Sequence, residues 1–144
     1  MIRKLFISIF ALFLFTGLYA QDITEPDNRL YDVYAEEQIQ DWMQNKPHII
    51  ELKNTELNYG YEFKTMPEDK AAQFPELIKI DPKTKTETGT VDKVNESDFN
   101  LFLYKYKRNY NSDNFYRIGN TQKVLVIISH KKLADITNKN RNHD

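Results

Sequence analysis

The sequence predicts an α+β fold, and three observations support this prediction. Residues 29–45 carry apolar side chains at helical spacing, residues 99–128 hold strand-like runs separated by turn residues, and residues 130–137 form a short amphipathic segment. We therefore expect an antiparallel sheet made of a C-terminal three-stranded meander plus N-terminal strands. A long N-terminal amphipathic helix is expected to cover this sheet, and a short C-terminal helix to follow it.

The first twenty residues are typical of a secretory signal peptide. Two cations at positions 3 and 4 precede an apolar run over residues 5–15, and Ala20 provides a small residue before the expected cleavage point at Gln21. The apolar run is shorter than the roughly 20 residues that span a bilayer, and an uncleaved anchor helix is the alternative. The sequence thus predicts an exported protein, periplasmic or extracellular, with no stable membrane span after cleavage.

Removal of residues 1–20 leaves 124 residues, the size of one ordinary domain, with 18 basic and 21 acidic side chains. We expect a single α+β domain over 21–144, with a polar arm at 21–28 and a polar tail at 138–144. The near balance of charge argues against a nucleic-acid partner. The absence of cysteine excludes disulfides, cysteine-ligated zinc and thiol nucleophiles.

The N-terminal half of this domain begins with the expected helix over residues 29–45. Asp27 or Asn28 suits its start, and Pro47 ends it because the residue before a proline avoids the helical region. Residues 48–52 are either a strand or a continuation of the helical region. Residues 57–63 alternate in hydrophobicity and predict a half-buried strand with a bulge at Gly60.

The middle of the chain carries weaker patterns. Residues 64–75 predict a loop with a helical turn at 69–73, and residues 77–80 predict a short strand. Residues 83–90 contain no apolar side chain, and we expect them to form a mobile surface loop.

The C-terminal meander is expected to contain strands at 99–106, 115–118 and 123–129, the last buried on both faces and therefore central. Gly119 and Asn120 predict a two-residue hairpin turn of type II′ or I′, with Arg117 opposite Gln122. Ser129 suits the N-cap of the final helix.

Three segments resemble a pattern found in small, uncharacterised exported proteins of Gram-negative bacteria. They are Gln38 to Trp42 running on to Pro47, Phe99 to Leu101, and Tyr116 to Ile127, which together cover less than half of the expected mature chain. The resemblance implies an exported α+β domain, and it implies no activity and no catalytic residue.

The candidate ligand surface is a strand in which tyrosines and cations alternate. Such an arrangement stacks sugars and neutralises anions. The simpler interpretation is a strand that buries its tyrosines on one face and exposes its cations on the other. The residues concerned are Tyr104, Lys105, Tyr106, Arg108, Tyr116 and Arg117.

Catalytic and metal-binding patterns are weak. The three histidines, at positions 48, 130 and 143, show no metal-ligand spacing, and no Gly-x-Ser-x-Gly motif exposes a serine. We expect no cofactor, no metal and no catalytic residue. The sequence favours a non-catalytic binding or protein-interaction module of the bacterial cell envelope, with an envelope protein or a glycan as its partner. The alternative is a small-ligand or glycan-binding protein that uses the tyrosine-rich surface.

Overall fold

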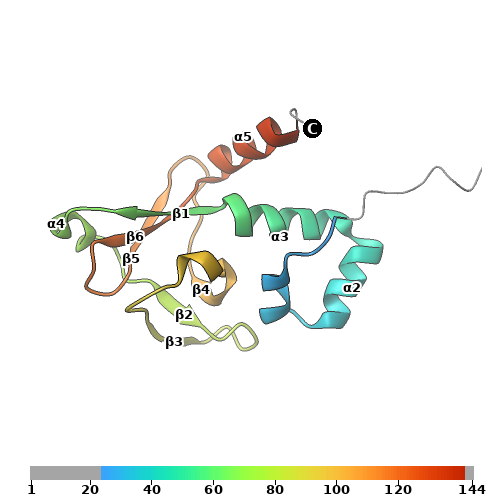
Figure 1. Cartoon of the computed structure of the whole chain (residues 1–144), viewed down its shortest axis with the longest axis horizontal. Helices are drawn as coiled ribbons and strands as arrows, with labels where there is room; N and C mark the ends of the chain where they lie inside the picture. Colours follow the sequence, from blue (N-terminus) through green and yellow to red (C-terminus); the bar gives the residue numbers. More distant parts are fainter. Residues whose placement is uncertain (1–23, 142–144) are drawn as a thin grey trace, which may run out of the picture.

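The computed structural model describes residues 24–141, so the predicted signal peptide, its cleavage point and the last three residues lie outside the described part. The protein is a mixture of helices and strands, with two small antiparallel sheets of three strands each (Figure 1). The expected α+β composition is therefore confirmed. The expected single sheet is wrong, because the strands divide into two sheets.

The N-terminal region contains two helical segments where one was expected. The 3-10 helix η1 (Asn28–Asp32) is followed by a break, and α2 (Glu36–Asn45) begins only after it. Asp27, one of the two residues expected at the N-cap, caps η1 by accepting a hydrogen bond from the Arg29 backbone N–H. The Arg29 carbonyl accepts a hydrogen bond from the side chain of Asn100. This carbonyl therefore has a partner distant in the sequence in place of a backbone N–H group of a helix.

The helix α2 ends before Pro47 as expected, but it does not cover a sheet. Its packing partners are η1 and the next helix, α3 (Pro47–Tyr59), which begins at that same proline. Trp42 is 8% exposed, and its ring centroid lies 4.9 Å from that of Tyr34. The expected burial of Trp42 is confirmed, whereas the expected position of the helix against the sheet is wrong.

The first sheet has the strand order β1-β6-β5. Helix α3 leads directly into β1 (Tyr61–Thr65) through Gly60, which is the helix C-cap and not the expected strand bulge (Figure 1). The central strand is β6 (Lys123–Ile127), which pairs with β1 on one side and with β5 (Asn114–Arg117) on the other. The predicted strand over 57–63 is therefore correct only in its last residues.

Strand β6 is buried on both faces, as its sequence predicts. Leu125 and Ile127 face the main hydrophobic core, while Val124 and Val126 face a second, smaller cluster around Ala71. Ala71 belongs to the short helix α4 (Glu68–Ala71). The main core is formed by residues from both helical and strand segments: Leu30, Ile39, Trp42, Ile50, Leu57, Leu77, Phe99, Leu101, Phe102, Ile118, Leu125 and Ile127 among them.

The second sheet has the order β3-β2-β4, with β2 (Ile78–Ile80) at its centre. The strand β3 (Glu87–Thr90) lies within the polar segment that we expected to be a loop, so that expectation is wrong for these residues. All four residues of β3 are exposed, so its pairing with β2 depends on backbone hydrogen bonds and needs no apolar side chain.

The predicted strand over 99–106 is mostly a different structure. Residues Glu96–Asp98 (η2) and Leu101–Leu103 (η3) form 3-10 turns, and only β4 (Tyr104–Lys105) pairs, with β2 and not with β5. The expected three-stranded meander is thus wrong, although its β5–β6 hairpin is correct.

The hairpin between β5 and β6 has a positive φ of 55° at Gly119, as predicted. The Thr121 N–H donates to the Ile118 carbonyl over 3.3 Å, which closes a turn around Gly119 and Asn120. The strand register differs from the expected one, since Arg117 lies opposite Val124 and not opposite Gln122.

The final helix, α5 (His130–Arg141), is longer than the predicted 130–137 and includes the first part of the expected polar tail. Among residues 24–141, no helix has the length and apolar character needed to cross a membrane.

Candidate functional site: a groove between α3 and α5

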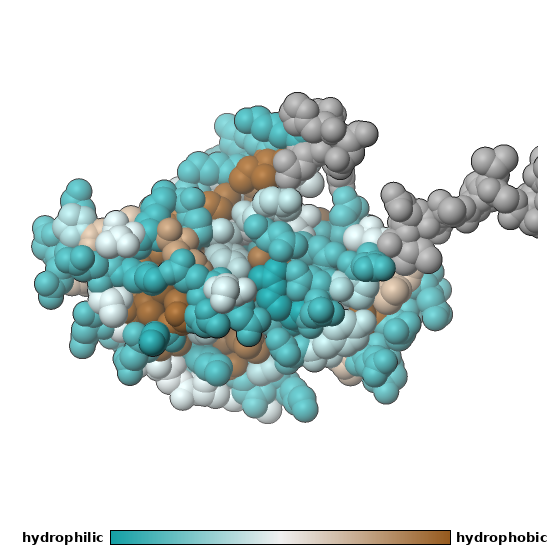
Figure 2. Space-filling model, viewed as in Figure 1, coloured by the Kyte–Doolittle hydropathy of each residue, from teal (hydrophilic) through white to brown (hydrophobic). Residues whose placement is uncertain are grey.

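A groove of about 480 Å³ runs between α3 and α5. Figure 2 shows hydrophobic residues along the side of α5 nearer to α3, with hydrophilic residues on the opposite side of that helix. The groove is lined on the α3 side by Glu51, Leu52, Thr55 and Glu56, and on the α5 side by His130, Leu133, Ala134, Thr137 and Asn138. An apolar strip with polar groups at its margins is a typical surface for binding another molecule.

The α3 side of the groove carries an exposed leucine. Ile50 and Leu57 face the core and are almost fully buried, so the opposite side of the helix points outward. Leu52 lies on this outer side and is 63% exposed, the highest exposure of any large aliphatic side chain in the described residues. An exposed leucine alone is common, but one that lines a groove indicates a binding surface.

The start of α5 is held firmly in place. The Ser129 hydroxyl accepts a hydrogen bond from the Lys132 N–H over 3.4 Å, which confirms the predicted N-cap. Asp113 accepts from the Ser129 N–H over 2.9 Å and pairs with the Lys132 ammonium. Burial raises the pKa of Asp113, but the hydrogen bonds from Lys132 and Ser129 outweigh this effect and leave it below its usual value. The α5 side of the groove is therefore anchored to the sheet.

The α3 side is braced by a buried cation, Arg108. Its Nη1 donates to the carbonyl oxygens of Gly60, over 3.0 Å, and of Ile128, and its Nη2 lies 3.6 Å from a Glu56 carboxylate oxygen. The Arg108 side chain is only 5% exposed, and its Nη2 has no hydrogen-bond partner. The same Glu56 carboxylate accepts a hydrogen bond from the Tyr106 hydroxyl over 2.8 Å. This cluster joins the end of α3 to the ends of β1 and β6.

Gly60 is required by this arrangement. A Cβ atom at this position would lie 2.5 Å from the Glu56 carbonyl oxygen and 2.7 Å from Arg108 Nη2. Burial raises the pKa of the Tyr106 hydroxyl far above its usual value, and the neighbouring Glu56 carboxylate adds to the effect. Tyr106 therefore acts as a neutral hydrogen-bond donor at every ordinary pH.

The predicted tyrosine–cation surface does not form one exposed face. Tyr104 stacks on Phe99 with ring centroids 4.8 Å apart, and Lys105 of β4 pairs with Glu87 of β3 in the same sheet. Tyr106 and Arg108 belong to the buried cluster just described. Part of the proposed ligand surface is thus used to hold the fold together.

The other two members of that surface lie in the first sheet. The Tyr116 hydroxyl accepts a hydrogen bond from the Lys107 N–H over 2.8 Å, and Arg117 pairs with Glu76 over 2.6 Å.

Two further hollows, of about 590 and 440 Å³, are lined by residues 93–97 and by residues 25–28 with Asn54 and Asn58. Neither these hollows nor the α3–α5 groove is lined by Tyr104, Tyr106 or Tyr116.

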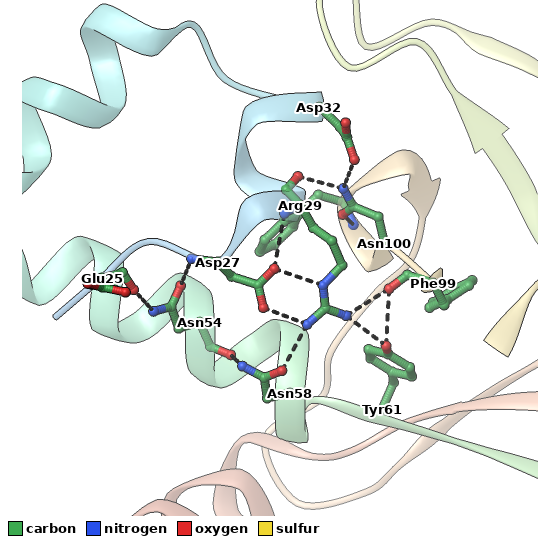
Figure 3. A network of polar contacts seen from close by, with 10 residues as sticks. Glu25, Asp27, Arg29, Asp32, Asn54, Asn58, Tyr61, Phe99 and Asn100 are labelled. Carbon is green, nitrogen blue, oxygen red and sulfur yellow. Dashed lines mark hydrogen bonds and ion pairs between the residues drawn. The ribbon is translucent and has the colours of Figure 1, made fainter. Parts of the chain in front are cut away.

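A second polar cluster anchors the N-terminal arm to α3 (Figure 3). The Arg29 guanidinium pairs with Asp27 over 2.7 Å and donates to the Asn58 side chain and the Phe99 carbonyl. The hydrogen bond from Arg29 lowers the pKa of the Asp27 carboxyl below its usual value. Because every nitrogen of Arg29 that is able to donate has a partner in the chain, this cluster is a structural tie.

The described residues offer no built metal site, since no group of three or more His, Asp or Glu side chains among them is arranged to hold an ion. The buried Ser129 hydroxyl is engaged as a helix cap. Of the three hollows, the α3–α5 groove is the one lined by a large exposed apolar side chain, Leu52.

No protein-family model, curated protein or solved structure matches this chain.

The groove was not among the sites predicted from the sequence. Leu52 and Tyr59 are seven residues apart on α3, and Leu133 and Thr137 are four apart on α5, so each helix carries a spacing that indicates one face. The predicted strand over 57–63 concealed the α3 pattern. The pairing of the two helices is a tertiary feature that neither pattern contains.

Proposed function

We propose that the protein is an exported, non-catalytic binding module of the bacterial cell envelope, periplasmic or extracellular, and that it binds a protein partner through the α3–α5 groove. The observation that carries this proposal is the exposed Leu52 on the α3 side of a groove whose other side is the partly apolar α5. Burying an exposed leucine on association contributes about 1.5–3 kcal/mol, enough to make one residue dominate a small interface.

Export is supported by the first twenty residues, which combine a cationic start, a short apolar run and a small residue at the expected cleavage point. Intact-mass measurement on protein from its native host tests this part. The expected form begins at Gln21, and a mature protein that retains residues 1–20 would contradict the proposal of a cleaved signal.

Binding is tested by affinity purification from envelope fractions of the host with quantitative mass spectrometry. The wild-type protein is compared with Leu52→Glu, which places a charge in the groove, and with Thr88→Glu on the exposed strand β3 as the matched control. We expect a protein that is enriched with the wild type and with Thr88→Glu but lost with Leu52→Glu. Equal enrichment with all three would show that the groove does not bind the partner.

A further inference from the structure

We infer that residues 109–113, in the connection between β4 and β5, bind an envelope glycan through a sugar ring stacked on Tyr110. None of these residues lines the α3–α5 groove. The inference goes beyond the proposed function, because it adds a glycan at a separate site to the protein partner of the groove. It is based on the exposure of Tyr110, on the hydrogen bonds that hold its backbone, and on the polarity of the residues beside it.

Tyr110 is the most exposed large hydrophobic side chain of the described residues, at 70%. The hydroxyl groups of Tyr61, Tyr106 and Tyr116 each form a hydrogen bond within the fold. Within residues 24–141, no hydrogen bond and no ring contact involves the Tyr110 side chain. Packing therefore does not explain an aromatic residue at this position. A tyrosine offers a ligand a large apolar face, and it loses little conformational entropy on binding because only two torsions become fixed.

The loop holds Tyr110 in place before a ligand arrives. The carbonyl oxygens of Asn109 and Tyr110 accept hydrogen bonds from the first two N–H groups of α5, each over 3.0 Å. The Asn109 side-chain amide donates to the side-chain oxygen of Asn114 over 2.8 Å, and Asp113 accepts from the Ser129 N–H over 2.9 Å. The backbone on both sides of Tyr110 is thus tied to neighbouring elements, and a preformed site loses less entropy on binding.

The residues beside the ring favour a sugar as the ligand. Asn111 and Ser112 are exposed, and their amide and hydroxyl groups both donate and accept hydrogen bonds, as sugar hydroxyls do. The one acidic side chain of the loop, Asp113, is 10% exposed and pairs with Lys132. The apolar C–H face of a pyranose ring packs on an aromatic ring while its hydroxyls reach the polar groups around it. A protein partner would need further apolar area around the ring, and the exposed loop residues supply none.

The charge near the loop also bears on the ligand. Lys107 precedes the loop and is exposed, and Lys131, also exposed, donates its backbone N–H to the Tyr110 carbonyl. Positive charge at both places disfavours a cationic ligand. A neutral sugar and a sugar that carries a carboxylate both suit the site.

The test is binding of the processed protein to two purified glycans of its host, with peptidoglycan sacculi in one arm and surface polysaccharide coupled to beads in the other. We expect saturable co-sedimentation in at least one arm, and the arm that binds identifies the source of the sugar. Tyr110→Ala should weaken this binding at least about tenfold, because it removes the stacking ring. Tyr110→Phe keeps the ring and should bind nearly as tightly as the wild type. Tyr59→Ala removes another exposed tyrosine, on α3, and is the matched control.

No saturable binding in either arm, or a Tyr110→Ala variant that binds as tightly as the wild type, would overturn the inference. Equal weakening by Tyr110→Ala and Tyr59→Ala would overturn it as well. Leu52→Glu changes only the groove and should bind the glycan normally. A wild-type protein that captures a protein partner through the groove but binds neither glycan would therefore overturn this inference and leave the proposed function standing.

Discussion

Replacement of Arg108 by methionine should destabilise the fold strongly. Methionine keeps most of the apolar stem but removes the guanidinium that serves the Gly60 and Ile128 carbonyl oxygens and faces Glu56. Hydrogen bonds to a charged group contribute about 1.5–3 kcal/mol each, and removing one partner of a buried ion pair costs about 3–5 kcal/mol. The Glu56 side chain is 31% exposed, so water relieves part of its lost pairing. We therefore expect a loss near the lower limit, about 3 kcal/mol.

Urea unfolding measures this loss directly. The chain contains one tryptophan, Trp42, which is buried in the folded protein and reports unfolding by its fluorescence. Lys107→Met is the matched control, because Lys107 is the exposed neighbour of Arg108 and its loss should change the unfolding free energy by less than about 0.5 kcal/mol. An Arg108→Met variant within about 1 kcal/mol of the wild type would refute the structural role assigned to this arginine.

Three further predictions follow from the fold. Trp42→Ala should cost about 3–5 kcal/mol of unfolding free energy, measured by urea denaturation followed by circular dichroism, and an unchanged midpoint would contradict its packing. Gly119→Val should be destabilising, because φ is 55° there and a Cβ atom would lie 2.9 Å from the Cα of Asp92; a melting temperature equal to that of the wild type would contradict this geometry. The lowered pKa of Asp27 stabilises the fold above the usual carboxyl value of about 4, and this contribution is lost as the pH falls through the lowered pKa. Asp27→Asn should therefore lose less stability than the wild type on acidification from pH 5, as measured by denaturation at each pH.

Local sequence patterns correctly predicted the elements whose surroundings in the fold match their own pattern of apolar and polar residues. The strand over 123–127 carries apolar residues on both faces, and both faces are buried because the main core covers one and the cluster around Ala71 covers the other. The positive φ of Gly119 and the Ser129 cap depend on a few adjacent residues, and both are correct. These features need no information about distant parts of the chain.

The errors arise where distant residues decide the local structure. The helical spacing of apolar residues continues through residues 33–35, but the helix is interrupted there. The Arg29 carbonyl instead accepts a hydrogen bond from Asn100, which is 71 residues away in the sequence. The alternation of apolar and polar residues over 57–63 predicted a strand, but Leu57 is a core residue of helix α3. Pro47 both ends α2 and begins α3. Proline at a helix boundary does not reveal by itself whether a new helix follows.

The candidate site was also only partly predictable from local sequence patterns. Tyr106 and Arg108 have the composition of a ligand surface, yet the structure uses both inside a cluster with Glu56. The groove depends on the position of α5 relative to α3, which is set by contacts of Asp113 and Arg108 with other segments. The spacing of residues in the sequence identifies the faces of the two helices, but it does not show that the two helices lie side by side.

The most direct test of the proposed binding function is site-specific photo-crosslinking in the native host. A photoreactive phenylalanine analogue replaces Leu52 in the groove, and in a second strain it replaces Thr88 on the exposed strand β3 as the control. The proposed function predicts a covalent adduct with a protein from position 52 and none from position 88. The absence of any adduct from position 52, or equal adducts from both positions, would contradict binding through the groove.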